Sequence, residues 1–288
     1  MIVEVEGVSL KYKENFALKN VSFKLEEGKI YGLLGRNGAG KTSLLSLLAS
    51  FREPTEGVIK IFGETPFENA KVMGQVGLIY DKEHNDEAEK VKNMLEIAER
   101  YRPNYDAEYA KHLVERFKLP LDRPVGKLSK GMQAALNVTI GLASRMPLTI
   151  FDEAYLGMDA PTREIFYQEL LEDQSKNPRT FILSTHFVSE MDYLFDEVLI
   201  LEKGELILQE EYEEFISRGA SITGDASVVD QFVQGMKKLS EQQLGNTKSV
   251  MVYGKMSDEK KQEALAAGLD VGPVARQDLF IHLTGKDE

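Results

Sequence analysis

The chain has 288 residues, long enough for one large or two modest domains with a sizeable buried core. Its composition, 42% hydrophobic and 28% charged, is that of an ordinary soluble globular protein. The formal net charge of −12 argues against a primary role in binding nucleic acid or an anionic membrane face, so a nucleotide is the expected phosphate ligand. The absence of cysteine excludes disulfides and thiolate metal sites.

The apolar residues are too dispersed for a membrane protein. Residues 1–13 lack the hydrophobic stretch of a secretory signal, and no later window approaches the roughly 18 continuous apolar residues of a membrane-spanning helix. We therefore expect a cytoplasmic protein. If it acts on a membrane, another chain crosses that membrane.

The N-terminal part combines strand patterns with one helix. Residues 1–34 alternate with the period of two that is typical of β-strands and end in an apolar run. A glycine-rich stretch then leads into a leucine-rich helical pattern at 42–50, which Pro54 and Gly57 end before a strand at 58–62. A β-rich start followed by strand, loop and helix is the expected order.

The middle of the chain, from about 81 to 145, is more polar and is predicted to be a helical insert. It is followed by short apolar strands at 148–151 and 180–183, with a helix at 161–174 between them. Apolar strands that alternate with helices predict an α/β fold with a parallel sheet covered on both faces. The helices expected in the insert cover 91–101, 107–117 and 131–144.

A hairpin over 198–208 and a short acidic helix at 210–216 are predicted to close the first domain, residues 1–216. The boundary is expected within 217–225. The remainder, 217–288, is predicted to be a small accessory or regulatory α/β domain, with a strand at 249–253 and helices at 258–267 and 277–283. The acidic clusters 86–89 and 210–214 are expected to be solvated helix faces.

A phosphate-binding loop is predicted between the apolar run and the leucine-rich helix. Residues 35–42 follow the spacing G-x-x-x-x-G-K-[ST], which directs backbone N–H groups and a helix N-terminus toward phosphate oxygens. Lys41 is expected to contact the β and γ phosphates, Thr42 to hold Mg²⁺ and Ser43 to donate to the α phosphate. The loop residues predicted to bind ATP are Gly35, Arg36, Asn37, Gly38, Ala39, Gly40, Lys41, Thr42 and Ser43.

Polar residues follow two of the apolar strands. Asp152 and Glu153 come at the end of strand 148–151, where one carboxylate can serve Mg²⁺ and the other can polarise the attacking water. His186 follows the strand that starts at 180, so it is expected at the same edge of the sheet, within reach of the γ phosphate. Together with the loop, these residues predict ATP hydrolysis.

At this point the order of residues resembles that of the ATP-binding subunits of ABC transporters, over roughly residues 1–216. Residues 128–133, Leu-Ser-Lys-Gly-Met-Gln, are similar to the family's signature segment Leu-Ser-Gly-Gly-Gln. Ser129 is also a good helix N-cap in its own right. The resemblance implies that Asp152 and Glu153 are the Walker B aspartate and the catalytic glutamate, that 157–159 is the D-loop with Asp159, and that His186 is the switch histidine.

The resemblance also implies a P-loop NTPase fold of ABC type, with an N-terminal antiparallel β subdomain, and a composite site. In the family, two subunits pair head to tail, and the signature segment of one covers the γ phosphate held by the lysine of the other. Such a subunit forms a homodimer, or a heterodimer with another ATP-binding subunit. It attaches to the inner face of the membrane through integral membrane permease subunits. The residues expected to act in trans are Ser129, Lys130, Gly131 and Met132.

Tyr12 matches the family's aromatic residue that stacks on adenine, and Phe16 is the alternative. The chain departs from the family at other positions. Asp81 stands where a glutamine is usual; its carboxylate is still a good Mg²⁺ ligand. Lys130 and Met132 replace glycine and glutamine, and Ala154 replaces a proline.

The tail indicates a branch of the family. Residues 276–285 are similar to the end of subunits that serve ABC-2-type exporters of drugs, bacitracin-like antibiotics and peptides, including phenol-soluble modulins. Two alternatives stay open: a soluble ABC-type ATPase outside transport, and a sensor that clamps ATP with little turnover. Glu153 argues against the sensor, whereas the residues at 81, 130 and 132 favour it.

Overall fold

The computed structural model describes residues 1–81, 87–186 and 191–285. The chain forms two compact units. The first unit comprises Met1–His186 and Tyr193–Gln209, and the C-terminal unit comprises Phe187–Asp192 and Glu210–Glu288. We describe each unit by itself.

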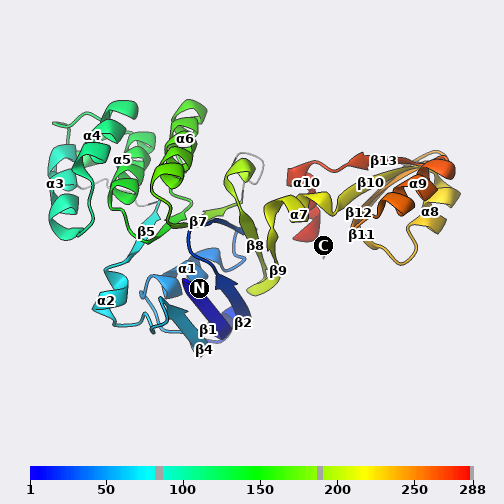
Figure 1. Ribbon diagram of the computed structural model, residues 1–288, viewed down its shortest axis with the longest axis horizontal. Coiled ribbons are helices and arrows are strands. Elements are labelled where there is room, and N and C mark those ends of the chain that lie inside the picture. The colour runs from blue at the N-terminus through cyan, green and yellow to red at the C-terminus, as the bar shows by residue number, and fades with distance from the viewer. Residues whose placement is uncertain (82–86, 187–190, 286–288) are drawn as a thin grey trace. The chain divides into compact units, whose positions relative to one another are not determined.

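A six-stranded sheet, in the order β5-β6-β7-β3-β8-β9, forms the centre of the first unit (Figure 1). Its strands are β3 (Ile30–Leu34), β5 (Val76–Tyr80), β6 (Leu148–Asp152), β7 (Thr180–Thr185), β8 (Glu197–Glu202) and β9 (Glu205–Glu211). The pairs from β5 through β8 are parallel. All residues of β3, β6 and β7 are buried, which explains their nearly continuous apolar sequences.

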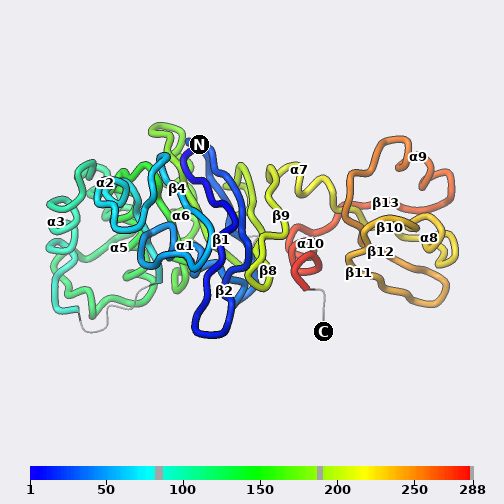
Figure 2. The backbone as a smooth tube through the Cα atoms, turned by 90° about the horizontal axis from the view of Figure 1, so that it is seen from below, coloured from blue at the N-terminus to red at the C-terminus, as the bar shows by residue number. Residues whose placement is uncertain are grey.

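A second, three-stranded antiparallel sheet consists of β1 (Val3–Tyr12), β2 (Asn15–Leu25) and β4 (Glu56–Ile61). Helix α1 (Lys41–Leu48) lies between the two sheets (Figure 1, Figure 2). Its four buried leucines form one hydrophobic cluster with residues of β1, β2 and β4 and with residues of β3, β6 and β7. The segment after the phosphate loop is therefore held from both sides.

Helices of the predicted insert stand together in the first unit, away from the three-stranded sheet (Figure 1). The helices of the first unit that follow α1 are α2 (Ala70–Met73), α3 (Val91–Tyr101), α4 (Ala107–Arg116), α5 (Lys130–Ala143) and α6 (Ala160–Lys176). On the insert's side of the large sheet, Phe166 of α6 packs edge-on against Phe151 of β6, with ring centroids 5.2 Å apart. The predicted parallel sheet with both faces covered is thus confirmed.

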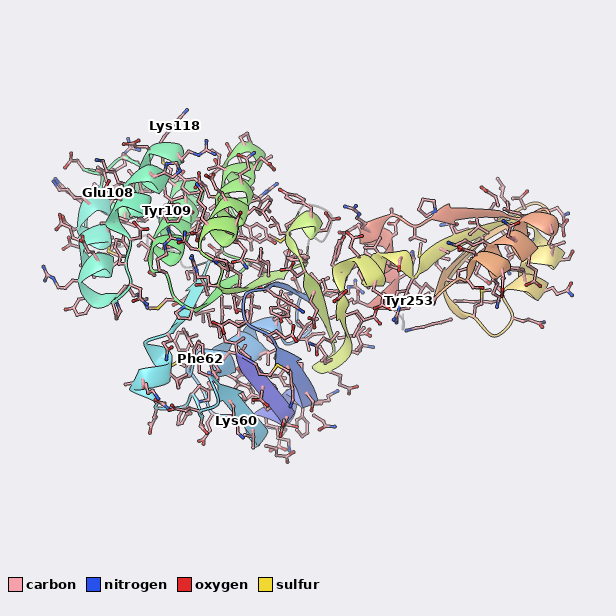
Figure 3. All side chains as sticks on the ribbon, in the orientation of Figure 1. Lys60, Phe62, Glu108, Tyr109, Lys118 and Tyr253 are labelled. Atoms are coloured by element: carbon pink, nitrogen blue, oxygen red, sulfur yellow. The ribbon has the colours of Figure 1, made fainter. Side chains whose placement is uncertain are left out.

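Buried charges join α4 to α6. Glu169 of α6 is almost fully buried, and its carboxylate lies 2.8 Å from Arg116 Nε and 3.0 Å from His112 Nε2. Tyr109, labelled in Figure 3, donates its hydroxyl to the backbone carbonyl of Glu169 at 3.3 Å. Arg145, just after the C-terminal end of α5, binds both Asp106 and Asp173. These contacts fix the insert to the helix that follows the D-loop.

The C-terminal unit is a four-stranded antiparallel sheet in the order β11-β12-β10-β13. The elements run β10 (Gly219–Asp225), α8 (Ala226–Phe232), β11 (Lys237–Leu244), β12 (Thr247–Tyr253), α9 (Asp258–Ala266) and β13 (Asp270–Pro273). This βαββαβ order is the ferredoxin-like arrangement. The unit also contains α7 (Tyr212–Ser217) and α10 (Arg276–Leu283).

The structure differs from the sequence prediction at two places in this region. The stretch expected to be a boundary, 217–225, is largely the inner strand β10, and the units divide at Gln209. Glu87 and Glu89 precede α3 and are not in a helix, while Asp86 of that acidic cluster lies outside the described residues.

Candidate functional site

The phosphate loop connects β3 to α1, as its sequence predicts. Gly38 and Gly40 have φ angles of 81° and 108°, in the region that favours glycine. At Gly40, which caps α1, a Cβ atom would come within 2.7 Å of the Ala17 carbonyl oxygen. Glycine is therefore required here both for the backbone conformation and for the close approach of β2.

A turn far along the chain supports this loop. The Lys203–Gly204 turn joins β8 to β9, and the Gly204 backbone N–H donates to the Ala39 carbonyl at 3.0 Å. Gly204 in turn accepts the backbone N–H of Lys19 at 2.8 Å. The sequence predicted this hairpin, but its contact with the loop could not be read from local residues.

Lys41 is buried at the start of α1, with its ammonium group directed back over the loop. Its Nζ donates to the Gly35 carbonyl at 2.8 Å and lies 3.4 Å from Glu153 Oε1. His186 Nδ1 lies 3.0 Å from the same carboxylate oxygen. Glu153 thus faces both the lysine of the loop and the histidine predicted from the next strand.

The side chains of Asp152 and Glu153 point in different directions because the backbone turns at Glu153. Glu153 has a φ angle of 50°, a left-handed conformation that is costly for a residue with a side chain. Ser184 of β7 stabilises the turn, since its hydroxyl accepts the Glu153 backbone N–H at 3.0 Å and donates to Asp152 Oδ1 at 2.5 Å. Ser184 faces Asp152 in the parallel register. Sequence analysis did not single out Ser184, whose role depends on that pairing.

A cavity of about 470 Å³ brings the expected metal ligands together. Thr42, Asp81, Asp152 and Glu153 all line it. Within the described residues, no group of three or more acidic, histidine or cysteine side chains forms a ready-made metal cage. Mg²⁺ is usually bound through one or two carboxylates, waters and substrate phosphates, so this hydroxyl-and-carboxylate set fits it.

The predicted signature segment forms the start of α5. The Ser129 side chain caps the helix by accepting the Met132 backbone N–H at 3.2 Å. Gly131 contacts the D-loop of the same chain: a Cβ there would lie 2.8 Å from the Gly157 carbonyl oxygen. Lys130 also approaches Gly157. None of the residues expected to act in trans lines the cavity beside Thr42.

Asp159 is the N-cap of α6 and accepts the Thr162 backbone N–H at 3.0 Å. The Thr162 side-chain and backbone hydrogen bonds lower the pKa of Asp159 below its ordinary value. Asp159 is therefore an exposed, ionised N-cap of α6, and it follows Gly157, the D-loop residue that contacts the signature segment.

Both aromatic candidates for adenine stacking are partly exposed, at 38% for Tyr12 and 43% for Phe16. Each already carries a cation on its ring: the Arg52 guanidinium is 4.8 Å from the centroid of Tyr12, and Lys11 Nζ is 4.6 Å from that of Phe16. The geometry thus leaves both rings as candidates.

A glycine-rich loop between the parallel strand β3 and a helix, with carboxylates at the end of β6, which only β7 separates from β3, defines a P-loop nucleoside triphosphatase. The family described as ABC transporter matches residues 18–156. The chain is 31% identical over 222 residues to Nod factor export ATP-binding protein I of Ralstonia nicotianae, covering 75% of this chain and 69% of that protein. It is 31% identical over 198 residues to ABC transporter ATP-binding protein NatA of Bacillus subtilis, covering 66% and 80%.

A solved ATP-binding subunit of an ABC transporter has 25% identity and a TM-score of 0.68, covering 75% of this chain and 92% of that one. The chain belongs to the ABC transporter family, as an ATP-binding ATPase subunit. The predicted fold class is thereby confirmed. In the part of the chain that the structure describes, no helix is both long enough and apolar enough to cross a membrane.

Proposed function

We propose that this subunit hydrolyses ATP to power an ABC-2-type membrane exporter of drugs, antibiotics or peptides. The ATPase assignment depends on one arrangement: Glu153 lies between Lys41 and His186, beside the cavity that Thr42 and Asp152 line. The exporter assignment is supported by the resemblance of the tail at 276–285, and one relative is named for Nod factor export.

Each residue then has a specific role in hydrolysis. Phosphate oxygens compete with Glu153 for the Lys41 ammonium group, and this competition leaves the carboxylate available to accept a proton from the attacking water. His186 orients that carboxylate and contacts the γ phosphate. Bound Mg²⁺ supplies charge neutralisation at the phosphates, with Thr42, Asp152 and Asp81 as its protein ligands. Tyr12 stacks on adenine, with Phe16 as the alternative.

The site is completed by a second ATP-binding subunit. We infer that Ser129, Lys130, Gly131 and Met132 of one copy cover the γ phosphate held by Lys41 of the other, with Asp159 at the same interface. ATP then favours the paired state, and loss of the γ phosphate favours separation. Integral membrane permease subunits would couple this cycle to export, with the subunit attached to the cytoplasmic face of the membrane. In this arrangement residues 217–288 are accessory.

Glu153→Gln tests the assignment. Losing the proton acceptor is expected to lower ATP turnover by about 100-fold or more while ATP binding is retained. The matched control is Glu115→Gln, an exposed glutamate of α4, which should keep full turnover. Both forms are co-purified with the membrane proteins encoded beside their gene.

Each alternative predicts a different result. Unchanged hydrolysis in Glu153→Gln would show that the base is assigned wrongly. Hydrolysis without any recovered membrane partner would favour a soluble ATPase outside transport. Tight ATP binding with negligible turnover in the unsubstituted chain would favour the clamping sensor, which the residues at 81, 130 and 132 make the second candidate.

A further inference from the structure

A pocket in the C-terminal unit combines an apolar wall with three lysines. It has a volume of about 250 Å³ and lies where β11, the end of β12 and the start of α9 come together. Its apolar lining includes Val252, Met236 and Met256, which belong to or pack against the hydrophobic core of the unit. Its ammonium groups come from Lys237, Lys255 and Lys260.

These three lysines lack the counter-ions that Lys248 and Lys261 of the same unit have. Among residues 210–285, no carboxylate lies within ion-pair distance of the ammonium group of Lys237, Lys255 or Lys260. Lys248, by contrast, is 2.7 Å from Asp230 and 3.2 Å from Glu241. In a chain of net charge −12, three neighbouring cations without an ion pair are a local excess of positive charge.

Three acidic residues of this unit, Glu210, Glu214 and Asp258, already have other partners. Arg218 binds both Glu210 and Glu214, at 2.5 and 2.7 Å, and Tyr253 donates its hydroxyl to Glu210 at 3.1 Å. Arg218 is the main cause of the lowered pKa of Glu214, to which Lys255 also contributes. On α9, the carboxylate of Asp258 lies 3.5 Å from Lys261, outside the pocket lining.

An aromatic ring adds to the apolar wall. Tyr253, labelled in Figure 3 at the end of β12, lines the pocket, and Lys237 Nζ lies 5.6 Å from its ring centroid. The volume is below the roughly 300–1,000 Å³ of pockets for drug-sized ligands, so the pocket suits a smaller molecule. A ligand that matches this lining has an anionic group near the lysines and a short apolar part that contacts Tyr253 and the methionines.

We propose that this pocket binds a small amphipathic anion, consisting of a carboxylate or phosphate group joined to a short apolar chain. The site lies wholly within the C-terminal unit and does not depend on the function proposed for the phosphate loop. The shared chemistry of the two head groups is a negative charge that accepts hydrogen bonds from lysine.

The full chain with ¹³C-labelled methionine methyl groups is titrated with hexanoate, hexyl phosphate and hexan-1-ol. Two of its ten methionines, Met236 and Met256, line the pocket and report binding there, so binding at the phosphate loop does not confuse the result. Both anions should shift these two signals selectively, and the neutral alcohol should not. If only one of the two anions, hexanoate or hexyl phosphate, shifts the signals, that result identifies the preferred head group.

Substitution of all three lysines, Lys237→Gln, Lys255→Gln and Lys260→Gln, should weaken binding by about tenfold or more, because charge-assisted hydrogen bonds are lost. The control substitutions are Lys238→Gln and Lys261→Gln, adjacent lysines that do not line the pocket; they should stay within about twofold of the unsubstituted chain. Equal binding of hexan-1-ol, unshifted methionines, or affinity that survives the triple substitution would overturn the proposal.

Discussion

Gly131 of the signature segment touches Gly157 of the D-loop within one chain. The contact is close enough that a Cβ on Gly131 would lie 2.8 Å from the Gly157 carbonyl oxygen. Since this neighbour is backbone, it cannot move aside as a flexible side chain does. The spacing between these two segments is thus set by the absence of a side chain at position 131.

Gly131→Ala is therefore expected to force α5 away from the D-loop. We expect a loss of unfolding free energy of about 1–3 kcal/mol from overpacking, measured by urea denaturation. ATP turnover should fall more than ATP binding, because the phosphate loop itself is untouched. Gly272→Ala is the control, since no atom lies within 4 Å of a Cβ there. Equal stability of the two variants would contradict the proposed packing constraint.

The support that the turn at Gly204 gives to the phosphate loop can be tested by substitution. Gly63 is the control, because its backbone conformation is similar. Gly204 and Gly63 have φ angles of 84° and 78°, so alanine at either position should cost about 1–2 kcal/mol. Only at Gly204 would the added Cβ also collide, at 2.7 Å, with the Ala17 carbonyl oxygen; at Gly63 the space is open.

Gly204→Ala should consequently displace the turn that donates to Ala39 and weaken ATP binding by about tenfold, as measured by calorimetry. Gly63→Ala should bind ATP like the unsubstituted chain. If both variants bound ATP equally well, the turn would have no part in shaping the loop.

Asp106 gives the insert a pH-dependent contact. Burial by itself would raise its pKa, but the Tyr109 backbone N–H and the Arg145 guanidinium outweigh this effect and lower the pKa below its ordinary value. Because the pKa is lower in the folded state than in the unfolded state, where it is about 4, the ionised Asp106 stabilises the fold at pH values above 4. This stabilisation is lost as the pH falls through the pKa of the folded state.

Asp106→Asn keeps an N-cap acceptor for α4 but removes the charge. We expect it to lower the unfolding free energy at pH 7 by about 0.5–1 kcal/mol, because the ion pair is partly exposed and Arg145 retains Asp173. The difference should shrink toward zero below pH 4 in urea unfolding. Asp258→Asn, at a fully solvated aspartate, is the control. A deficit that does not shrink at all as the pH falls from 4 to 2 would rule out the charge as its cause.

Much of the first unit follows from local sequence. The phosphate loop, the strands that precede Glu153 and His186, and the helices of the insert have clear patterns, because glycine geometry and apolar periodicity are local properties. Ser184 and Gly204 could not be found this way. Their roles come from strand register and from a contact between segments far apart in sequence.

The C-terminal unit was predicted least completely for a related reason. Strand β11, Lys-Lys-Leu-Ser-Glu-Gln-Gln-Leu, is mostly polar, and β10 is rich in small residues. Neither has the apolar alternation of a typical strand, so pairing with β12 determines their conformation more than intrinsic preference does.

Contacts within the chain determine the conformation of the phosphate loop. The Gly204 backbone N–H donates a hydrogen bond to the Ala39 carbonyl, the Lys41 ammonium group donates one to the Gly35 carbonyl, and α1 is packed between two sheets. The loop is thus preorganised. Because its residues are already ordered before a nucleotide binds, their loss of conformational entropy on binding is small and reduces the binding free energy little. Discrimination between ATP and ADP should then be governed by the enthalpy of contacts to the terminal phosphate, without a large entropic penalty from the loop.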